Sequence, residues 1–551
     1  MNLDRTVPLA TRRRAVRAAA AAVVAAAVVA LQPAEAGPQD GTSWPSRDGT
    51  VTHGQDTRMA DWFVVENTPW GAEGPAGTPG ASGSASEQSP LRTVVGPWPT
   101  MIHLDVPAGV AVSIEVTRVA GALPAVLWVQ DAAGRAWTPA SVRTSRALRT
   151  SEVVTVDDGG LDVVLSPTRT AVARVNVVVR ARPSEGGTTG PATTSPWAPG
   201  RIVATSSDPA AAHDLAGQLG LQVIETGDGF VVLGTPAERA GYEWTDAAWM
   251  ASISGSDVGF EPDAYAEPPE TSQTNQLIVG SEFGRQMDRQ IGFRMVGLPS
   301  APAGLDGTGV VIAVVDTGVD ATHPRLAGHV LPGYDFVDGD DDASDVRDGL
   351  DNDGDGTPDD GFGHGTVVAG VAHALAPAAM LLPVRVLDDE GLGTASRVAQ
   401  GIRWAVDHGA HVINLSLGTR TWSVVLESAV RDAVARGAIV VVAAGNDGDR
   451  WSVDFPADVP GAIAVTALGV SGRRAWFGSG GRTTTIAAPG VNVIGPYPGN
   501  TYARGRGTSF AAPFASGAAA LLLQKSPGAD VYVFRAVVAP NWRLNLRQLW
   551  R

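Results

Sequence analysis

The stretch of sequence that decides the fold reads GVVIAVVDTGVD and spans residues 309–320. Its apolar run, Val310 to Val315, is typical of a strand buried on both faces, and Asp316 follows at once. Similar apolar runs alternate with helical patterns in the rest of this half of the chain. The predicted strands are Val310 to Val315, Leu381 to Val386, His411 to Leu415 and Ile439 to Ala443, and the predicted helices are His364 to Ala374, Ser396 to His408, Val424 to Arg436 and Thr508 to Gln524. This order predicts an α/β fold in which helices cover both faces of a parallel sheet.

Polar residues follow the predicted strands at the point where each strand ends. Asp316 ends the first strand, Ser416 and Gly418 follow the third, and Asn446 follows the fourth. Open parallel sheets bind their ligands outside the carboxyl ends of the strands. We therefore expect these residues to converge on one edge of the sheet and to form a site there.

A serine and a histidine at predicted helix starts complete a catalytic pattern. Ser509 opens an alanine-rich helix, where backbone N–H groups have no partner within the helix. Because a serine alcohol is a weak nucleophile, it needs a base within reach, and His364 can be that base. Asp316 would orient the imidazole, and Asn446 would stabilise the oxyanion together with the N–H of Ser509. Each residue alone is more typical of a turn or a helix cap, so the prediction depends on their joint occurrence.

Four short segments carry a resemblance to a known family. They are Asp316-Thr317-Gly318-Val319-Asp320 with His323-Pro324, Gly363-His364-Gly365-Thr366, Ala443-Ala444-Gly445-Asn446, and Gly507-Thr508-Ser509-Phe510-Ala511-Ala512-Pro513. Together they look like the subtilisin-like serine peptidases, whose chain order of Asp, His and Ser is matched here. The resemblance covers residues 304–524 and implies a subtilisin-like fold. It further implies a serine endopeptidase that works through an acyl-enzyme intermediate, with Asp316, His364 and Ser509 as its triad and Asn446 in its oxyanion hole.

The same resemblance implies a cleft that pairs with a peptide or protein substrate as an added strand. The substrate-binding residues would be Ser416, Leu417, Gly418, Ala444, Gly445 and Asp454. Asp454 occupies the position of the pocket floor, where a carboxylate favours Arg or Lys just before the scissile bond. Alternatively, Asp454 faces solvent or helps to hold a cation.

Several positions depart from the family pattern. Val367 stands where a second histidine is common, and Phe510 and Phe514 replace the usual Met and His. The 27 residues that follow Gln524 lack the Gly-rich segment that usually closes the fold. These departures leave an alternative open, an exported scaffold or binding protein that keeps the fold without catalysis.

An acidic insertion precedes the predicted base. Residues 335–360 contain twelve Asp and one Arg, and so supply -11 of the net charge of -16. Within it, Asp351, Asp353, Asp355 and Asp359 are spaced like the first ligands of a Ca²⁺ loop, although Phe362 stands where such a loop has Glu. The insertion therefore predicts a structural calcium site, with a solvated acidic loop as the alternative.

Composition limits the remaining functions. An acidic chain does not hold nucleic acid by neutralising phosphates, and the absence of cysteine excludes disulfides, zinc thiolate clusters and cysteine nucleophiles. At the N-terminus, a basic segment around Arg13, an apolar run to Leu31 and the motif Ala34-Glu35-Ala36 predict a signal peptide over residues 1–36, with features of the twin-arginine type. The apolar run is shorter than the roughly 20 residues of a membrane anchor. We therefore expect a secreted protein without a membrane span in its mature chain.

The domain organisation follows from shifts in composition. Residues 37–90 and 186–200 are predicted linkers, 91–185 a β-sandwich, 201–300 a small α+β module with a connector, and 301–551 the catalytic domain. The module resembles subtilase prosegments, which implies a folding chaperone and an intramolecular inhibitor. Within it, the acidic, Pro-rich stretch 257–270 is predicted to be a processing linker.

Overall fold

The computed structural model describes strands between residues 65 and 183, and then residues 196–206, 208–235, 258–270, 277–353, 356–450, 453–481 and 486–550. The expected signal peptide, the expected linker 37–90 apart from residues 65–66, residues 186–195 of the second expected linker and the predicted ligand Asp355 lie outside the described residues. The second linker was predicted to end too late, because a strand begins at Trp197. Where the chain is described, no helix combines the length and the apolar character needed to cross a membrane.

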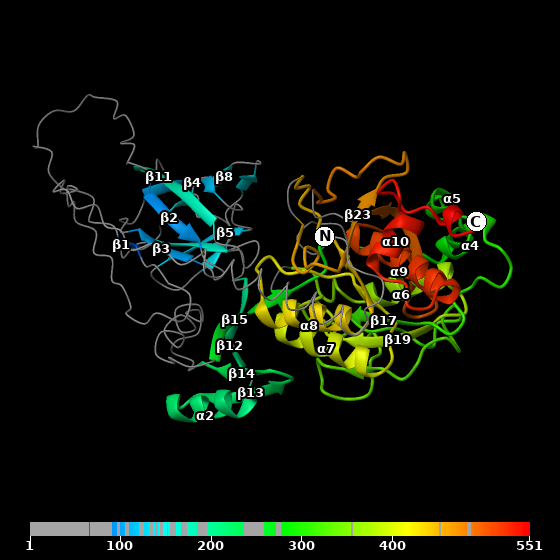
Figure 1. Cartoon of the computed structure of the whole chain (residues 1–551), viewed down its shortest axis with the longest axis horizontal. Helices are drawn as coiled ribbons and strands as arrows, with labels where there is room; N and C mark the ends of the chain where they lie inside the picture. Colours follow the sequence, from blue (N-terminus) through cyan, green and yellow to red (C-terminus); the bar gives the residue numbers. More distant parts are fainter. Residues whose placement is uncertain are drawn as a thin grey trace, which may run out of the picture. The chain divides into compact units, whose positions relative to one another are not determined.

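A parallel sheet of seven strands forms the centre of the second half of the chain, which confirms the predicted α/β class (Figure 1). Its strand order is β18-β19-β17-β21-β22-β23-β24. The bounds are β17 (Val311–Asp316), β18 (Tyr334–Asp335), β19 (Met380–Arg385), β21 (Val412–Leu415), β22 (Ile439–Ala443), β23 (Ile463–Leu468) and β24 (Ile486–Pro489). Neighbouring strands are all parallel, so their carboxyl ends share one edge.

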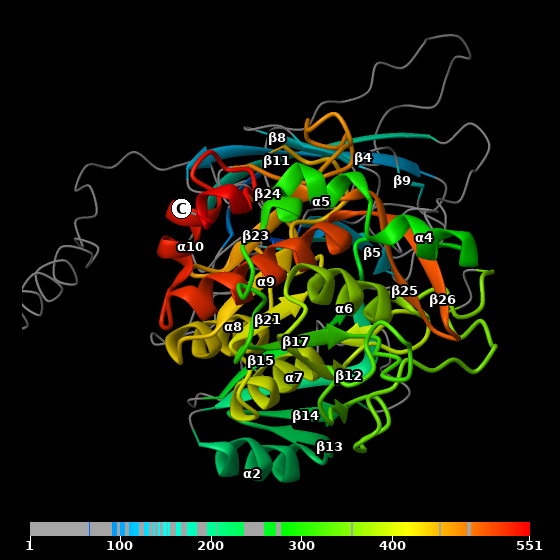
Figure 2. The same cartoon turned by 90° about the vertical axis from the view of Figure 1, so that its right-hand side faces the viewer.

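Helices cover both faces of this sheet (Figure 2). Alternate side chains of β17 separate the two cores, because Ile312 and Val314 pack into one and Ala313 and Val315 into the other. The first core contains α6 (His364–Leu375) and α9 (Thr508–Lys525), and the second contains α7 (Ala395–Asp407) and α8 (Val424–Ala435). Burial on both faces explains why β17 is apolar at every position before Asp316.

The segment after α9 completes the first core. It forms α10 (Val531–Val538) and the short helix η4 (Leu546–Gln548), and it buries Phe534, Val538, Leu544 and Leu546. Its backbone also pairs with the edge strand β24, since Ala487 donates to Trp542 and accepts from Leu544. The unfamiliar C-terminal sequence therefore closes the sheet.

A small module precedes the central sheet. It consists of β12 (Trp197–Ser206), α2 (Pro209–Leu219), β13 (Gln222–Gly227), β14 (Phe230–Gly234) and β15 (Val258–Ala266). Helix α2 packs through Ala212 and Ala216 against a core that includes Ile202 and Phe260. Strand β15 pairs on one side with β12 and on the other with β20 (Gly393–Thr394) of the second half. The prediction of a linker at 257–270 was wrong, because residues 258–266 form this strand.

The remaining elements are two β-sheets in the first half of the chain and several short elements of the second half. Two sheets, ordered β1-β3-β10-β5-β6 and β2-β11-β4-β8-β7, occupy residues 65–183, with β9 paired to β4. Their strands are β1 (Val65–Glu66), β2 (Leu91–Val95), β3 (Thr100–Leu104), β4 (Val110–Ala120), β5 (Val126–Asp131), β6 (Ala136–Trp137), β7 (Ser141–Arg143), β8 (Ala147–Thr150), β9 (Val153–Val154), β10 (Leu161–Ser166) and β11 (Ala173–Pro183). Around the catalytic half lie β16 (Ile278–Val279), η2 (Ser281–Phe283), α4 (Gly284–Met287), α5 (Ile291–Val296), η3 (Leu298–Ser300), β25 (Val491–Tyr497) and β26 (Thr501–Arg506).

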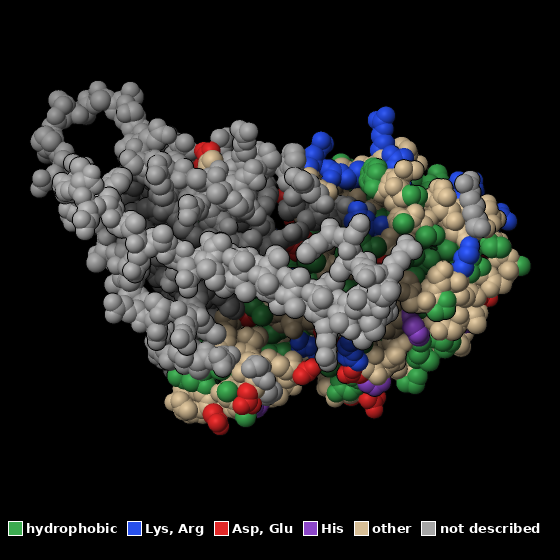
Figure 3. All heavy atoms as spheres, viewed as in Figure 1, with side chains coloured by type: hydrophobic (Ala, Val, Ile, Leu, Met, Phe, Trp, Pro, Cys, Tyr) green, Lys and Arg blue, Asp and Glu red, His purple; other side chains and the backbone are tan. Residues whose placement is uncertain are grey.

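Charged, neutral and hydrophobic side chains are interspersed over the described surface in Figure 3. Asp and Glu side chains are most visible along the lower edge of that view, around α2.

Candidate active site

Asp316 and His364 meet at the carboxyl edge of the sheet. Asp316 is the last residue of β17, and His364 is the first residue of α6. His364 Nδ1 lies 2.7 Å from Asp316 Oδ1, and the same oxygen accepts from the N–H of Thr317 at 2.9 Å. Both side chains are buried. The carboxylate therefore fixes the orientation of the imidazole and favours its protonated form.

The first turn of α6 takes its hydrogen-bond acceptors from outside the helix. Gly363 occupies the N-cap in a left-handed conformation with φ of 84°, and it brings no capping side chain. Instead, Asp345 accepts from Gly363 N at 3.0 Å and from Thr366 N and Oγ1 at 3.3 and 2.7 Å. Thr317 Oγ1 accepts from Gly365 N at 3.0 Å. Burial raises the pKa of Asp345 to about 7, although the hydrogen bonds from Thr366 and Gly363 act in the opposite direction.

Ser509 lies in the first turn of α9, directly beside β21. Pro513 has no N–H, so it leaves the carbonyl of Ser509 without its usual partner four residues along the helix. The hydroxyl of Ser416 donates to that carbonyl at 2.7 Å and replaces the missing bond. In return, Ser509 Oγ lies 3.0 Å from the carbonyl of Ser416. Ser416, predicted as a substrate-binding residue, thus holds the serine in place.

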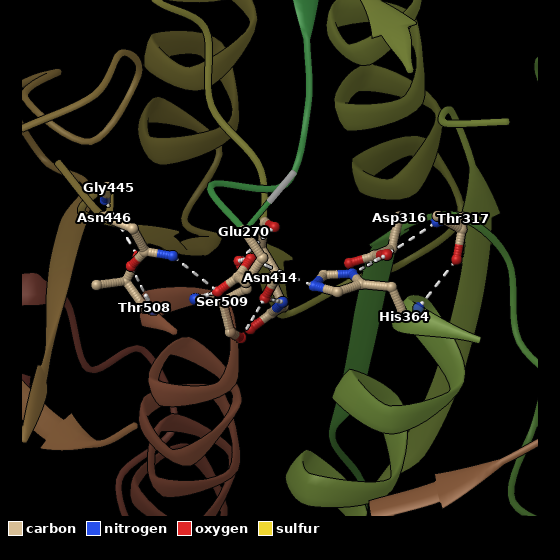
Figure 4. Close-up of polar contacts among 11 residues, drawn as sticks. Glu270, Asp316, Thr317, His364, Asn414, Gly445, Asn446, Thr508 and Ser509 are labelled. Carbon is tan, nitrogen blue, oxygen red and sulfur yellow. Dashed lines mark hydrogen bonds and ion pairs between the residues drawn. The ribbon is translucent and has the colours of Figure 1, made fainter. Parts of the chain in front are cut away.

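Asn446 lies on the opposite side of Ser509 from His364 (Figure 4). Its Oδ1 accepts from both the N–H and the hydroxyl of Thr508 at 3.0 Å. Thr508 Oγ1 also accepts from Gly445 N at 3.1 Å. Because the oxygen of the amide is held by Thr508, its Nδ2 group is turned toward Ser509.

The side chain of Glu270 lies between the serine and the histidine (Figure 4). Ser509 Oγ donates to Glu270 Oε2 at 2.6 Å, and Asn446 Nδ2 and Ser509 N donate to Oε1 at 3.0 and 3.3 Å. His364 Nε2 lies 3.8 Å from Oε2. Burial lowers the pKa of His364, but Asp316 and Glu270 together outweigh it and raise the value to about 10. In this arrangement the imidazole holds its proton and cannot accept one from Ser509.

Glu270 reaches this position because the chain enters the site as an added strand. β15 pairs with β20 through Tyr265 and Ala266, and Glu267 then pairs with Gly418. Glu267 N donates to Gly418 O at 3.0 Å, and Gly418 N donates to Glu267 O at 2.9 Å. We call residues 264–270 the cleft segment. It shows that the two backbone edges, at Gly393 and at Gly418, hold a peptide between them.

The other predicted substrate-binding residues differ in what they can offer a peptide, either their backbone alone or a side chain as well. The side chain of Leu417 is buried in the second core, so only its backbone can contact a peptide. Asp454 N donates to the carbonyl of Ala444 at 3.1 Å, and a Cβ on Gly445 would overlap the Asp454 carboxylate. Asp454 therefore lies half-buried against the two predicted walls, since its Cβ also lies next to Gly418. Burial raises its pKa well above the ordinary value, and Asp447 acts in the same direction.

The acidic insertion brings together a different set of carboxylates from the predicted one. Ligand oxygens of Asp348, Asp359 and Asp389 lie within 4.8 Å of one another. Of the predicted ligands, only Asp359 belongs to this group, and Asp351 instead accepts from Gly356 N at 3.0 Å. Asp389 comes from the loop after β19, so no spacing within the insertion could have identified it.

The fold thus brings the predicted residues Asp316, His364, Ser509 and Asn446 to one edge. Sequence reasoning did not single out Asp345, Thr508 and Glu270, which lie around them. Thr508 lies within a quoted motif, yet its role depends on its distance from Asn446. Glu270 is separated from Ser509 by 239 residues along the chain. Only a tertiary structure can reveal contacts of this kind.

Comparison with known proteins agrees with this geometry. The model of the subtilase family, Peptidase S8, matches residues 307–543. Subtilisin Savinase of Lederbergia lenta is 44% identical over 233 residues, which are 41% of this chain and 80% of that protein. Thermitase of Thermoactinomyces vulgaris is 41% identical over 252 residues, 44% of this chain and 85% of the relative.

A solved structure extends the likeness beyond the catalytic half. Fervidolysin from Fervidobacterium pennivorans, described as a keratinolytic enzyme related to subtilisin, superposes with a TM-score of 0.53 at 25% identity, over 64% of this chain and 61% of its own. The range that the subtilase family model matches contains β17, α6 and α9, and so Asp316, His364, Asn446 and Ser509, whereas Glu270 lies before it. The chain belongs to the subtilase family and is a serine-type endopeptidase.

Proposed function

We propose that the protein is a secreted endopeptidase that uses Ser509 as nucleophile, His364 as general base and Asp316 as the group that orients the base. Ser509 Oγ attacks the scissile carbonyl while its proton moves to His364 Nε2, and the carbonyl oxygen takes up the negative charge. His364 then gives the proton to the leaving amine, and water hydrolyses the acyl-enzyme by the same route. Secretion rests on the predicted signal peptide, residues 1–36.

The observation that carries this proposal is the position of the Glu270 carboxylate. Its Oε1 accepts from Asn446 Nδ2 and from Ser509 N, the two donors that would stabilise an oxyanion. A Cβ on Gly507 would overlap this oxygen, so a glycine there keeps the space open. The site therefore accommodates a negatively charged oxygen next to the nucleophile.

We further propose that the module of residues 197–270 acts as an intramolecular inhibitor and assists folding. Two carboxylates of β15 cap helices of the catalytic domain: Glu261 accepts from Val424 N at 2.7 Å, and Asp263 accepts from Ser396 N at 3.1 Å. Each carboxylate thereby accepts from a backbone N–H group that has no acceptor within its own helix. The cleft segment then blocks Ser509.

The cleft segment differs from a good substrate in its last residues. Continuing the pairing of Glu267 with Gly418, an antiparallel strand places the residue after next, Pro269, opposite Ser416. Proline has no N–H to donate to the carbonyl of Ser416, which instead accepts from Ser509 Oγ. Ser509 is thereby held away from His364, its proposed base.

For substrates, we propose a preference for Arg or Lys just before the scissile bond. Asp454 lies half-buried behind Gly445, and Asp447, Asp449 and the cation Arg420 lie near enough to act on its pKa. A cationic side chain of the substrate would add a second positive charge beside these three carboxylates, whereas an apolar side chain would leave them with Arg420. An Asp454→Gly variant is expected to lose the preference in peptides that differ only at this position.

We also propose that Ca²⁺ binds to Asp348, Asp359 and Asp389. Carboxylates are ligands of the kind that Ca²⁺ prefers, and those of Asp359 and Asp389 act on each other. Added Ca²⁺ is expected to raise the Tm of the full chain, but not that of Asp389→Asn. An equal rise in both proteins would exclude this cluster, and Asp407→Asn, a surface substitution on α7, serves as control.

A fluorophosphonate probe tests the catalytic assignment. We expect the secreted protein to be labelled at Ser509 and Ser509→Ala to remain folded, unlabelled and inactive on peptides. Ser428→Ala, on the exposed surface of α8, is the matched control and should behave like the parent. Turnover by Ser509→Ala would refute the triad, and a folded but unlabelled parent would favour a scaffold without catalysis. N-terminal sequencing of the secreted protein tests cleavage after Ala36.

A further inference from the structure

A single arginine lies next to the backbone edge that holds the cleft segment. Arg420 Nε is 3.4 Å from Oε1 of Glu267, the residue whose backbone pairs with Gly418. The side chain of Glu267 is 27% exposed and that of Arg420 is 43% exposed, so the pair lies at the rim of the cleft. One residue of the peptide is therefore held both by its backbone and by its charge.

The backbone around Arg420 is held by contacts within the catalytic half. Thr419 N donates to Phe455 O at 2.7 Å, and Phe455 N donates back to Thr419 O at 3.2 Å. Thr419 and Thr421, on either side of Arg420, are buried. This pairing joins the arginine to the segment that carries Asp454. The guanidinium thus projects from a rigid edge, and little conformational entropy of the backbone is lost on binding.

The guanidinium of Arg420 interacts with carboxylates of the cleft segment and of the catalytic half. Burial lowers the pKa of Arg420, but Glu267 raises it most strongly among its neighbours, followed by Asp447 and Asp454. The two aspartates keep the arginine compensated when the cleft is empty. A carboxylate from a peptide adds a partner on the cleft side.

The register of the cleft segment assigns a substrate position to this contact. Glu267 lies opposite Gly418, and an antiparallel strand then places the residue two positions later opposite Ser416. Ser416 holds Ser509 Oγ through its carbonyl at 3.0 Å, so the residue opposite Ser416 presents the carbonyl that Ser509 attacks. The partner of Gly418 is therefore the third residue before the scissile bond.

We propose that Arg420 forms a subsite for an acidic side chain, Glu or Asp, at the third residue before the scissile bond. This inference rests on the proposed function and names part of its substrate class. Combined with the pocket of Asp454, it describes peptides with an acidic residue two positions before a basic one. The cleft segment uses the same subsite to hold itself in the cleft.

The test compares three peptides that are identical except for Glu, Gln or Lys at this third position. In the full chain the cleft segment competes with every peptide equally, so the ratio of two kcat/KM values does not depend on that competition. For a partly exposed ion pair we expect kcat/KM to be about threefold higher for Glu than for Gln and about tenfold higher for Glu than for Lys. Both ratios should decrease at high salt.

Variants of Arg420 decide the assignment. In Arg420→Gln the ratio of Glu to Lys should fall to about one, and in Arg420→Glu the preference should invert. Arg436→Gln, which removes an exposed arginine paired with Asp407 on the helix surface, is the control and should keep the parent's ratio. A ratio that stays unchanged in both Arg420 variants, while hydrolysis continues, would overturn the subsite.

A charge exchange within the full chain gives an independent readout. Glu267→Lys places two cations side by side, so the full chain should become more active on peptides. Combining it with Arg420→Glu should restore the low activity of the parent. Failure of the double variant to restore the block would overturn the proposed contact, and absence of hydrolysis in every variant would overturn the proposed function and the subsite with it.

Discussion

Replacing Glu270 by Gln should convert the full chain from a blocked peptidase into a partly active one. The carboxylate accepts hydrogen bonds from Ser509 Oγ, Asn446 Nδ2 and Ser509 N, and it lies next to the protonated His364. Glutamine keeps the shape of the side chain and one acceptor oxygen, but it removes the charge. Hydrogen bonds to a charged group are worth about 1.5–3 kcal/mol, compared with about 1 kcal/mol for neutral pairs. Since the Glu270 side chain is 9% exposed, solvent screens little of this difference.

A net loss of about 2–3 kcal/mol corresponds to a cleft segment that binds roughly 30- to 150-fold less tightly. Peptide hydrolysis by the purified full chain measures this loss as a rise in kcat/KM, and Glu282→Gln, an exposed glutamate of η2, is the matched control. Active-site titration must show that the number of labelled serines per chain has increased as well. Equal activities of parent and Glu270→Gln, with both chains uncut, would refute the reasoning.

The effect of Glu270→Gln on activity should depend on pH. With the cleft segment in place, the pKa of His364 is raised to about 10 from an ordinary value of 6.5. Asp316 contributes more to this rise than Glu270 and stays in place when the cleft segment leaves, so the smaller share that Glu270 contributes is lost as the pH rises through about 10. The difference in activity between parent and Glu270→Gln should accordingly shrink at alkaline pH. A difference that grows from pH 7 to pH 10 would contradict the role of the His364 charge.

The remaining predictions concern side chains that position the site. Thr508→Val should lower kcat by about tenfold at an unchanged KM, because Asn446 Oδ1 loses one of the two donors that orient its amide, whereas Thr322→Val, on the exposed surface, should not. The Tm of the parent should fall as the pH rises, and Asp345→Asn should remove the part of this fall that is due to Asp345. Burial raises the pKa of Asp345 to about 7, so its stabilisation is complete below 3.8 and lost toward 7. Glu261→Gln should weaken the pH dependence of module docking, since burial raises the pKa of Glu261 to about 7 and docking is favoured most below 4.5. Digestion of the module by added trypsin at pH 5 and pH 8 measures this effect.

Most of the central fold could be predicted from local patterns. The run from Val310 to Val315 became β17 with a shift of one residue, and the predicted helix Ser396 to His408 became α7 with a similar shift. Such runs are unambiguous because a strand buried on both faces must be apolar throughout. The stretch 257–270 was misjudged because its acidic residues suggested solvent. Glu261 and Asp263 are in fact buried, and helix N-termini far along the chain provide their partners.

The site was predictable only where motifs carry it. Asp316, His364 and Ser509 lie at element ends, which sequence patterns locate within a residue or two. The cation cluster shows the opposite case, because Asp389 joins Asp348 and Asp359 through folding rather than spacing. Leu417 shows a third case. Its neighbours line the cleft, whereas its own side chain points into the core.

The continuity of the chain between Glu270 and Leu277 changes how the block on Ser509 depends on dilution. Only six residues, 271–276, separate the two positions, so the cleft segment stays at an effective concentration of the order of millimolar. A segment with only modest intrinsic affinity can then occupy the cleft almost completely, at any concentration of the protein. One cut in this tether makes the same contacts bimolecular, and their occupancy falls as the enzyme is diluted. The occupancy of the cleft by the cleft segment therefore depends on a covalent connection as much as on the four polar contacts at Glu270.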